Sequence, residues 1–224
     1  MIKSIVQGKL KNAGKNYTID TRIPETYFYG LVFQRFIMRL RGLLFCQKPI
    51  FLGKSVVLKN KKNIVFGKNV TIENHSIIDG YASEEIVLGD NVKIGSYSKL
   101  LSTSHMGHFG KGLKMGNNSA IGDFTHFGAT GGLTIGNDVI MGSYISFHSE
   151  NHNYQNKTAL IREQGVSHKG ITIGNNVWVG AKVTFLDGSQ VGDNCVVAAG
   201  AVVNGIFPND VVIGGVPAKI LKSI

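Results

Sequence analysis

The sequence predicts an all-β fold: a parallel β-helix preceded by an N-terminal amphipathic helical extension. The first observation is that every sixth residue from position 173 to position 203 is large and apolar. The second is that a Gly directly follows three of these residues, and that small apolar residues stand four places after four of them. A fixed period of six is neither helical nor a simple strand alternation, so it indicates a solenoid of short stacked strands. The six apolar positions are Ile173, Val179, Phe185, Val191, Val197 and Val203.

The composition is the third observation. The 224 residues include 29 Gly but only 4 Pro, which fits frequent tight turns between ordered strands. The formal net charge of +10 favours anionic partners such as phosphates, acidic glycans or a membrane surface, and we expect no nucleic-acid partner. Only Cys46 and Cys195 are present, and Cys195 stands at an inward position, so we expect it to be a small buried hydrophobe. No apolar signal-peptide core is visible near residue 1, so a cytoplasmic setting is expected.

The first 50 residues are expected to form an extension that is separate from the solenoid. Residues 1–26 are polar and are expected to be an arm or loop. Residues 27–45 predict an amphipathic helix, with an apolar face opposite Gln34 and three arginines. Three arginines in so short a run argue against a membrane-spanning helix. The apolar face consists of Tyr29, Phe33, Phe36, Ile37, Leu40, Leu43 and Leu44, and the arginines are Arg35, Arg39 and Arg41.

Two interpretations of this helix remain open. In the first, its apolar face docks on the solenoid and caps an open end or covers a sheet edge. In the second, residues 27–45 attach the protein to the inner face of a membrane, with the arginines on anionic headgroups.

The second part of the chain, residues 51–224, carries the repeat. Three hexads make one triangular coil, so about seven coils are expected between residues 52 and 210. The repeat is interrupted, and we expect the interruptions to be insertions at coil corners, where extra residues leave the strands stacked. The longest insertion is expected to be a functional loop. The interruptions lie at residues 84–87, 106–114, 131–134 and 153–172.

Three motifs near the C-terminus carry a family resemblance. They are the run Ile-Gly-Asn-Asn-Val-Trp-Val-Gly-Ala from Ile173, the run Val-Val-Ala-Ala-Gly-Ala-Val-Val from Val196, and the closing Gly-Gly-Val-Pro-Ala-Lys. With these motifs, residues 52–224 resemble the hexapeptide-repeat acetyltransferases, in particular the galactoside/maltose acetyltransferase group and the capsule and lipopolysaccharide O-acetyltransferases. The resemblance implies a left-handed β-helix, a homotrimer, acetyl-CoA as co-substrate, and active sites in the clefts between neighbouring solenoids.

The resemblance places a catalytic His in the coil before the Val-Trp-Val-Gly run, which matches His152. A neutral imidazole with a pKa near ~6.5 suits the removal of a hydroxyl proton at neutral pH, so His152 is the expected general base. Glu150 stands two residues earlier and would face the same way in an extended backbone. We therefore expect Glu150 to orient the imidazole, although a backbone carbonyl could do the same.

Other polar residues near this position are candidates for binding the acceptor. His105 occupies the same place in its hexad as His152, two coils earlier, so the two side chains are expected in one column. His126 and His148 are expected to flank the cleft, and Asn151 precedes the catalytic His. His75, His108 and His168 offer no argument beyond exposure.

The resemblance also implies a donor site near the C-terminus. The Trp of the motif would line the cleft near the thioester, or pack in the trimer interface. Backbone groups at two Ala positions would bind the pantetheine arm, and two Lys would meet the coenzyme A phosphates as point charges. An Asn stands where relatives often have Thr. The matching residues are Trp178, Ala181, Ala199, Asn204, Lys219 and Lys222.

The expected function is therefore acetyl-CoA-dependent O-acetylation of a sugar hydroxyl in surface polysaccharide biosynthesis, with a saccharide acceptor and no metal. N-acetylation of an amino sugar is the alternative within the same chemistry. Two more distant alternatives are a zinc enzyme like the γ-carbonic anhydrases, with His105, His126 and His148 as the available ligands, and a non-catalytic solenoid scaffold.

Overall fold

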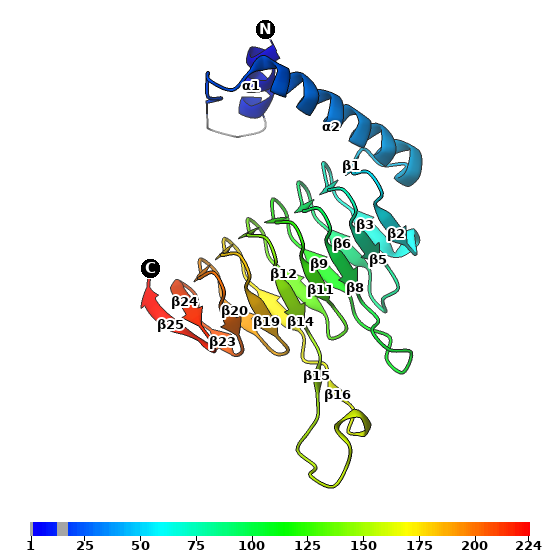
Figure 1. Cartoon of the computed structure of the whole chain (residues 1–224), viewed down its shortest axis with the longest axis vertical. Helices are drawn as coiled ribbons and strands as arrows, with labels where there is room; N and C mark the ends of the chain where they lie inside the picture. Colours follow the sequence, from blue (N-terminus) through cyan, green and yellow to red (C-terminus); the bar gives the residue numbers. More distant parts are fainter. Residues whose placement is uncertain (1, 13–17) are drawn as a thin grey trace.

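The structure, a computed structural model, describes residues 2–12 and 18–224. Its solenoid has three parallel faces, and the chain passes from the first face to the second and then the third before it climbs to the next coil (Figure 1). The strands contain only two or three residues in most coils, so hydrogen bonds to the coils above and below hold them rather than their own length. Sheet A contains β1 (Phe51–Leu52), β4 (Thr71–Ile72), β7 (Lys93–Ile94), β10 (Ala120–Ile121), β13 (Ile140–Met141), β18 (Trp178–Val179), β21 (Val196–Val197), β24 (Val211–Gly215) and β25 (Ala218–Ser223).

The other two faces have seven strands each, so the expected seven coils and the β-helical fold class are confirmed. Sheet B contains β2 (Val57–Lys59), β5 (Ile77–Asp79), β8 (Lys99–Leu101), β11 (His126–Gly128), β14 (Ser146–His148), β19 (Thr184–Leu186) and β22 (Val202–Val203). Sheet C contains β3 (Ile64–Phe66), β6 (Ile86–Leu88), β9 (Leu113–Met115), β12 (Leu133–Ile135), β17 (Ile171–Ile173), β20 (Gln190–Val191) and β23 (Ile206–Phe207).

The apolar residues of the six-residue period form the core. Equivalent positions stack from coil to coil: Phe147 is completely buried, and its ring lies 5.4 Å from that of Phe127 and 5.1 Å from that of Phe185, centroid to centroid. The register that pairs these three residues puts every sixth side chain on the solenoid axis. Cys195 is 1% exposed, as expected for an inward corner position.

Every interruption of the repeat lies at the corner between sheet B and sheet C. The two longest excursions run from residue 102 to 112, between β8 and β9, and from residue 149 to 170, between β14 and β17. The second contains the antiparallel hairpin of β15 (Asn151–His152) and β16 (Val166–Ser167), with the 3₁₀ turn η2 (Ile161–Glu163) near its tip. Both loops therefore project from the same edge of the solenoid (Figure 1).

Two helices precede the solenoid, and a 3₁₀ turn, η1 (Lys61–Asn63), lies in the first coil. Helix α2 (Glu25–Cys46) confirms the helix predicted over residues 27–45. Helix α1 (Ile2–Asn12) corrects the expectation that residues 1–26 form an arm or loop, and the spacing of Ile2, Val6 and Leu10 gives it an apolar side. Residues 1 and 13–17 of that expected arm lie outside the described part of the chain.

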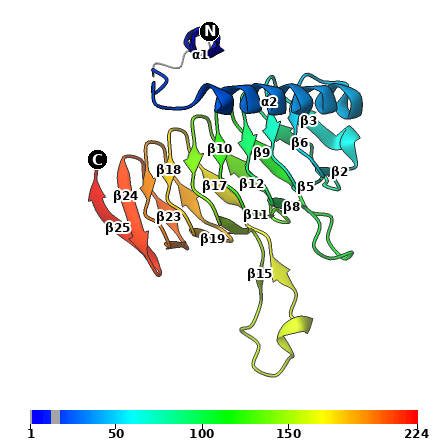
Figure 2. The ribbon, with the colours of Figure 1, turned by 45° about the horizontal axis from the view of Figure 1, so that its top comes forward.

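The expected docking face of α2 is wrong. Its buried residues are Phe28, Met38 and Gly42, and the helix lies beside the first coils of the solenoid (Figure 2). The Arg35 and Arg39 guanidinium groups lie 5.2 Å and 5.1 Å from the ring centroid of Phe51 on β1.

Polar contacts hold the same side of the helix. The Arg35 guanidinium donates to Thr71 Oγ1 at 3.3 Å, and Arg39 donates to Asn69 Oδ1 at 3.3 Å. The predicted polar side therefore supplies two of the docking residues, while most of the predicted apolar side is exposed. The first two coils offer the ring of Phe51 and the polar groups of Thr71 and Asn69 rather than an apolar surface, which is why arginines fit there better than leucines.

Candidate functional site

His152 lies on the hairpin that projects from the B–C corner. It pairs with Val166 in the antiparallel register of β15 and β16, and Asn151 pairs with Ser167. Both His152 and Asn151 are exposed, so an imidazole stands in reach of solvent at the base of the long loop. The hairpin thus presents the predicted base to any acceptor that lies along this edge.

Glu150 does not orient His152 in this chain. It links the loop between β8 and β9 to the loop between β14 and β17. Its carboxylate oxygens accept hydrogen bonds from Ser104 Oγ at 3.1 and 3.3 Å, and His168 Nε2 lies 3.1 Å from Glu150 Oε2. The His168 ring stacks on that of His108, with 3.9 Å between centroids. The expected orientation of His152 by Glu150 is therefore replaced by a contact with His168, a residue for which the sequence offered no signal beyond exposure.

Two further predicted residues share the outer face of sheet B. His148 is exposed, and its Nε2 lies 2.7 Å from Ser146 Oγ. The ring centroids of His126 and His148 are 5.9 Å apart. Partial burial first, and then the proximity of His148 and Lys99, lower the pKa of His126 below its usual value.

His105 lies in a tight turn of the other loop. Its Nδ1 accepts a hydrogen bond from the Gly107 amide at 3.0 Å, and its backbone forms a bridge with that of His108. The two loops meet one residue before it, where Ser104 bonds to Glu150. The alignment of the His105 and His152 side chains in one column along the solenoid therefore remains a prediction.

The predicted donor residues lie on sheet A. Trp178 is 59% exposed on β18, and the register places Trp178, Val196, Val212 and Lys222 side by side on four successive strands. The spacing between neighbouring strands is about 4.8 Å, so the three spacings make this row about 14 Å long. An aromatic ring stands at one end of the row and a cation at the other. Lys219 is exposed on the same final strand, β25.

The small predicted residues stand at the corner between sheets A and B. Ala181 and Ala199 are both exposed, and the Ala181 carbonyl accepts a hydrogen bond from the Gly200 amide at 2.9 Å. A Cβ on Gly180 would lie 2.5 Å from the Ala199 amide nitrogen, so this corner has room for backbone only. Asn204 is exposed after β22. Ala181 and Ala199 therefore place only small side chains at the corner that follows Trp178, whereas Asn204 lies at the corner between sheets B and C.

The single chain does not bring the two groups together. The predicted base lies at the B–C corner, whereas the donor row lies on sheet A and at the A–B corner. The two predicted groups therefore lie on different sides of one solenoid.

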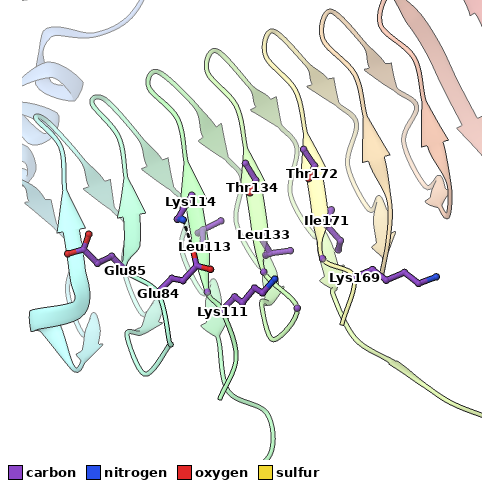
Figure 3. A pocket seen from close by; sticks show the side chains of 14 residues that line it. Glu84, Glu85, Lys111, Leu113, Lys114, Leu133, Thr134, Lys169, Ile171 and Thr172 are labelled. Atoms are coloured by element: carbon purple, nitrogen blue, oxygen red, sulfur yellow. Dashed lines mark hydrogen bonds and ion pairs between the residues drawn. The ribbon is translucent and has the colours of Figure 1, made fainter. Parts of the chain in front are cut away.

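A shallow pocket of about 210 Å³ lies on the sheet C side of the B–C corner. Figure 3 shows Lys111 and Lys169 beside it, and Lys114 paired with Glu84. It is smaller than the roughly 300–1,000 Å³ of typical ligand pockets, and none of the predicted donor or acceptor residues lines it. Lysine and glutamate side chains at its rim bind each other instead.

Within residues 2–12 and 18–224, no set of three or more His, Cys, Asp and Glu side chains is arranged around a common metal position. Over the same residues, no helix combines the length and hydropathy needed to cross a bilayer.

The solenoid is similar to proteins of known family. Residues 170–205 match the family model described as bacterial transferase hexapeptide (six repeats). The chain is 32% identical over 122 residues to WbbJ of Escherichia coli K12, which is named as a putative lipopolysaccharide biosynthesis O-acetyl transferase; the match covers 51% of this chain and 62% of that protein. It is 34% identical over 93 residues to the galactoside O-acetyltransferase of the same organism, covering 41% and 44% of the two chains. The chain thus spans about half the length of the curated relatives it matches.

A solved structure shows the same fold. A point mutant of AntD, an N-acyltransferase from Bacillus cereus in complex with dTDP and coenzyme A, aligns with a TM-score of 0.57 at 19% identity, covering 76% of this chain and 85% of that chain. The match to the repeat model and the curated relatives show that the solenoid is similar to bacterial hexapeptide-repeat transferases, and the solved structure shows that the fold is shared.

Proposed function

We propose that this chain is a homotrimeric O-acetyltransferase that moves an acetyl group from acetyl-CoA to a sugar hydroxyl in surface polysaccharide biosynthesis. The observation that carries the proposal is His152, an exposed imidazole on the β15–β16 hairpin at the position where the family resemblance expects the catalytic base. Relatives named as lipopolysaccharide and galactoside O-acetyltransferases support a saccharide acceptor. A cytoplasmic setting, at the membrane face where glycan precursors are assembled, fits this role.

The chemistry assigned to His152 is proton transfer. Its neutral imidazole takes the proton of the acceptor hydroxyl while that oxygen attacks the acetyl carbonyl, and the imidazolium then returns the proton to the departing thiolate. The products are an acetyl ester and a free thiol, so no proton is gained or lost overall. Acetyl-CoA supplies the acetyl group as a thioester, and no metal is needed for this transfer.

Sheet A carries the residues that fit the donor. In this proposal the pantetheine arm lies along the strip beside Trp178, where Ala181 and Ala199 leave the backbone accessible. The cations of Lys219 and Lys222 on β25 meet the phosphates as point charges. The row from Trp178 to Lys222 provides one continuous surface for an extended ligand.

The separation of these groups supports a site shared between copies of the chain, and the family resemblance makes that assembly a trimer. Because His152 and Trp178 lie on different sides of one solenoid, a reaction that needs both is completed when the hairpin of one copy approaches sheet A of its neighbour. His126, His148 and Asn151 are then the candidates to bind the acceptor beside the base, and the loop that contains His105 closes the same edge.

The test measures thiol release from acetyl-CoA with a panel of glycan acceptors. We expect acceptor-dependent release by the wild type and a loss of about 10²–10⁴-fold in kcat for His152→Ala, the usual contribution of general acid–base catalysis. His75→Ala is the matched control, because His75 lies between β4 and β5 in the second coil, several coils before both groups. Stability of the product to mild alkali separates an amide from an ester, and thus N-acetylation from O-acetylation.

Two outcomes would contradict the proposed function. Equal turnover by His152→Ala and the wild type, with both proteins in the same oligomeric state, would remove His152 from the mechanism. No release with any acceptor, together with no coenzyme A binding by calorimetry, would replace the transferase proposal with a scaffold role.

A further inference from the structure

One side of α2 is apolar and exposed although the opposite side is docked. Phe33 is 67% exposed and Phe36 is 63% exposed, values expected of charged residues rather than of phenylalanine. At 100° per residue the exposed apolar side chains occupy a stripe about 120° wide along the helix. The stripe consists of Tyr29, Val32, Phe33, Phe36, Leu40, Leu43 and Leu44, and we call it the α2 stripe.

The docking contacts fix the direction in which the α2 stripe points. Gly42 packs so closely on the chain that a Cβ there would collide with the Ile50 carbonyl oxygen. Met38 is 1% exposed, and Arg35 and Arg39 bind the first coils through Phe51 and polar partners. These contacts occupy the other side of the helix, so most of the α2 stripe faces away from the solenoid. Its edges border the solenoid, where Val32 and Phe36 line a groove with Phe51, and Phe33 lines one with Lys54 and Asn74.

The charge of the molecule is concentrated at the same end. Residues 1–62 contain 13 of the 24 Lys and Arg residues but two of the 14 Asp and Glu residues, a net charge of +11 against +10 for the whole chain. The remaining residues, 63–224, therefore carry a net charge of −1. The positive charge belongs to the helical end and not to the solenoid.

Several of these cations are available at the surface. Lys48, Lys54 and Lys62 are exposed next to the C-terminal end of α2. Lys61 is also exposed, and its Nζ donates to the Phe45 carbonyl at 2.6 Å, which holds its charge beside the helix. Arg35 and Arg39 contact the solenoid, so the lysines are the main cations beside the α2 stripe.

We propose that the α2 stripe and its flanking lysines bind the surface of an anionic lipid bilayer, with α2 lying in the interface. An apolar stripe buries itself among acyl chains, and lysines beside it attract acidic headgroups, so the two signals together give stable attachment where one alone is weak. If the α2 stripe packed on a second copy of the chain, two ends that each carry a net charge of +11 would repel each other. An anionic bilayer attracts the same charge instead.

The test is vesicle flotation of the full chain. The probes are vesicles of phosphatidylcholine alone and vesicles that also contain phosphatidylglycerol. We expect the wild type to bind the anionic vesicles, to bind neutral ones less, and to lose binding as salt rises. The double variant Phe33→Ser/Phe36→Ser should bind anionic vesicles at least about tenfold more weakly, because both rings leave the apolar phase.

A matched control removes apolar surface elsewhere. Ile206 and Ile224 are 71% and 68% exposed at the other end of the chain, and the double variant Ile206→Ser/Ile224→Ser should float as the wild type does. A second variant, Lys54→Gln/Lys62→Gln, should weaken binding to anionic vesicles while leaving binding to neutral ones unchanged.

Three outcomes would overturn the proposal. They are a wild type that does not float with anionic vesicles, a Phe33→Ser/Phe36→Ser variant that floats equally well, and a change in that variant's oligomeric state, which would assign the α2 stripe to an interface between copies. Turnover of a soluble acceptor in the absence of vesicles reports on the transferase separately, so failure of the membrane proposal leaves that activity measurable.

Discussion

At the scale of single residues, the histidines of this chain differ by environment rather than by sequence. His152 is exposed on a hairpin, and His168 shares a carboxylate with Ser104. His126 is half-buried beside another imidazole. The same side chain therefore serves as a candidate base, as a contact between loops and as a polar residue on sheet B. Only the first of these roles has a recognisable sequence motif.

The lowered pKa of His126 predicts a dependence of stability on pH. Burial first, and then His148 and Lys99, disfavour its protonated form in the folded chain, whereas the unfolded chain takes up the proton near pH ~6.5. The unfolded state thus binds more protons below about pH 6.5, so this contribution to stability is present above that pH and is lost as the pH falls. Chemical denaturation from about pH 8 to about pH 5 should show a shallower decline for His126→Gln than for the wild type. An identical decline in both proteins would contradict this assignment.

At the scale of elements, the corners of the solenoid are built from columns of residues with positive φ. At the corner between sheets C and A, these are Asn and Asp in successive coils, whose side chains tolerate this conformation and bond to one another. At the corner between sheets A and B, the equivalent positions of four successive coils hold rings that stack at 4.9–5.1 Å between centroids. The first column contains Asn69, Asn91, Asn118, Asp138, Asn176, Asn194 and Asp210, and the second contains His75, Tyr97, Phe124 and Tyr144.

Asn118 provides a test of the first column. It has φ of 58°, it accepts a hydrogen bond from Asn91 Nδ2 at 2.9 Å, and its own Nδ2 donates to Asp138 Oδ1 at 3.1 Å. Asn118→Ala loses both bonds and leaves in the left-handed region a residue that tolerates it less well than Asn, so we expect a loss of about 2 kcal/mol in the free energy of unfolding. Asn118→Gly loses the bonds but keeps the backbone unstrained, and should be about 1 kcal/mol more stable than the Ala variant. Urea denaturation measures the free energy of unfolding of both variants. Equal values would mean that the positive φ at residue 118 does not destabilise the Ala variant.

At the scale of the whole molecule, functions are distributed along and around the solenoid. The helical end carries the positive charge and the α2 stripe, the B–C corner carries the loops, and sheet A carries the row from Trp178 to Lys222. A rigid stack of coils keeps these surfaces apart, so groups on different sides meet only through assembly.

The proposed trimer therefore predicts complementation between inactive variants. His152→Ala keeps the donor row, and Trp178→Ala keeps the base. If each site takes one group from each of two neighbours, co-expression of the two variants should restore about a quarter of the wild-type activity, since one random pairing in four has both groups intact. Separately purified variants, mixed without subunit exchange, are the control. No recovery in verified mixed trimers would mean that each chain contains its own site.

Much of this molecule could be predicted from its sequence. The six-residue period placed Phe127, Phe147 and Phe185 in the core, because the large side chain at this position of each coil points inward and stacks on its equivalents in the neighbouring coils. The same period indicated the number of coils, and the helical spacing of residues 27–45 identified α2. These features depend on local geometry and hydropathy, which a sequence carries directly.

The arrangement of surfaces was decided only by the tertiary structure. The sequence could divide α2 into an apolar and a basic side, yet the solenoid accepts Arg35 and Arg39 through Phe51 and leaves the α2 stripe exposed, because the first strands offer an aromatic ring and polar partners instead of an apolar groove. Glu150 likewise meets His168 rather than His152, since a contact between two loops depends on how far each extends from its corner. The sequence by itself determined what is inside this protein, and the folded chain decided what its polar and exposed groups face.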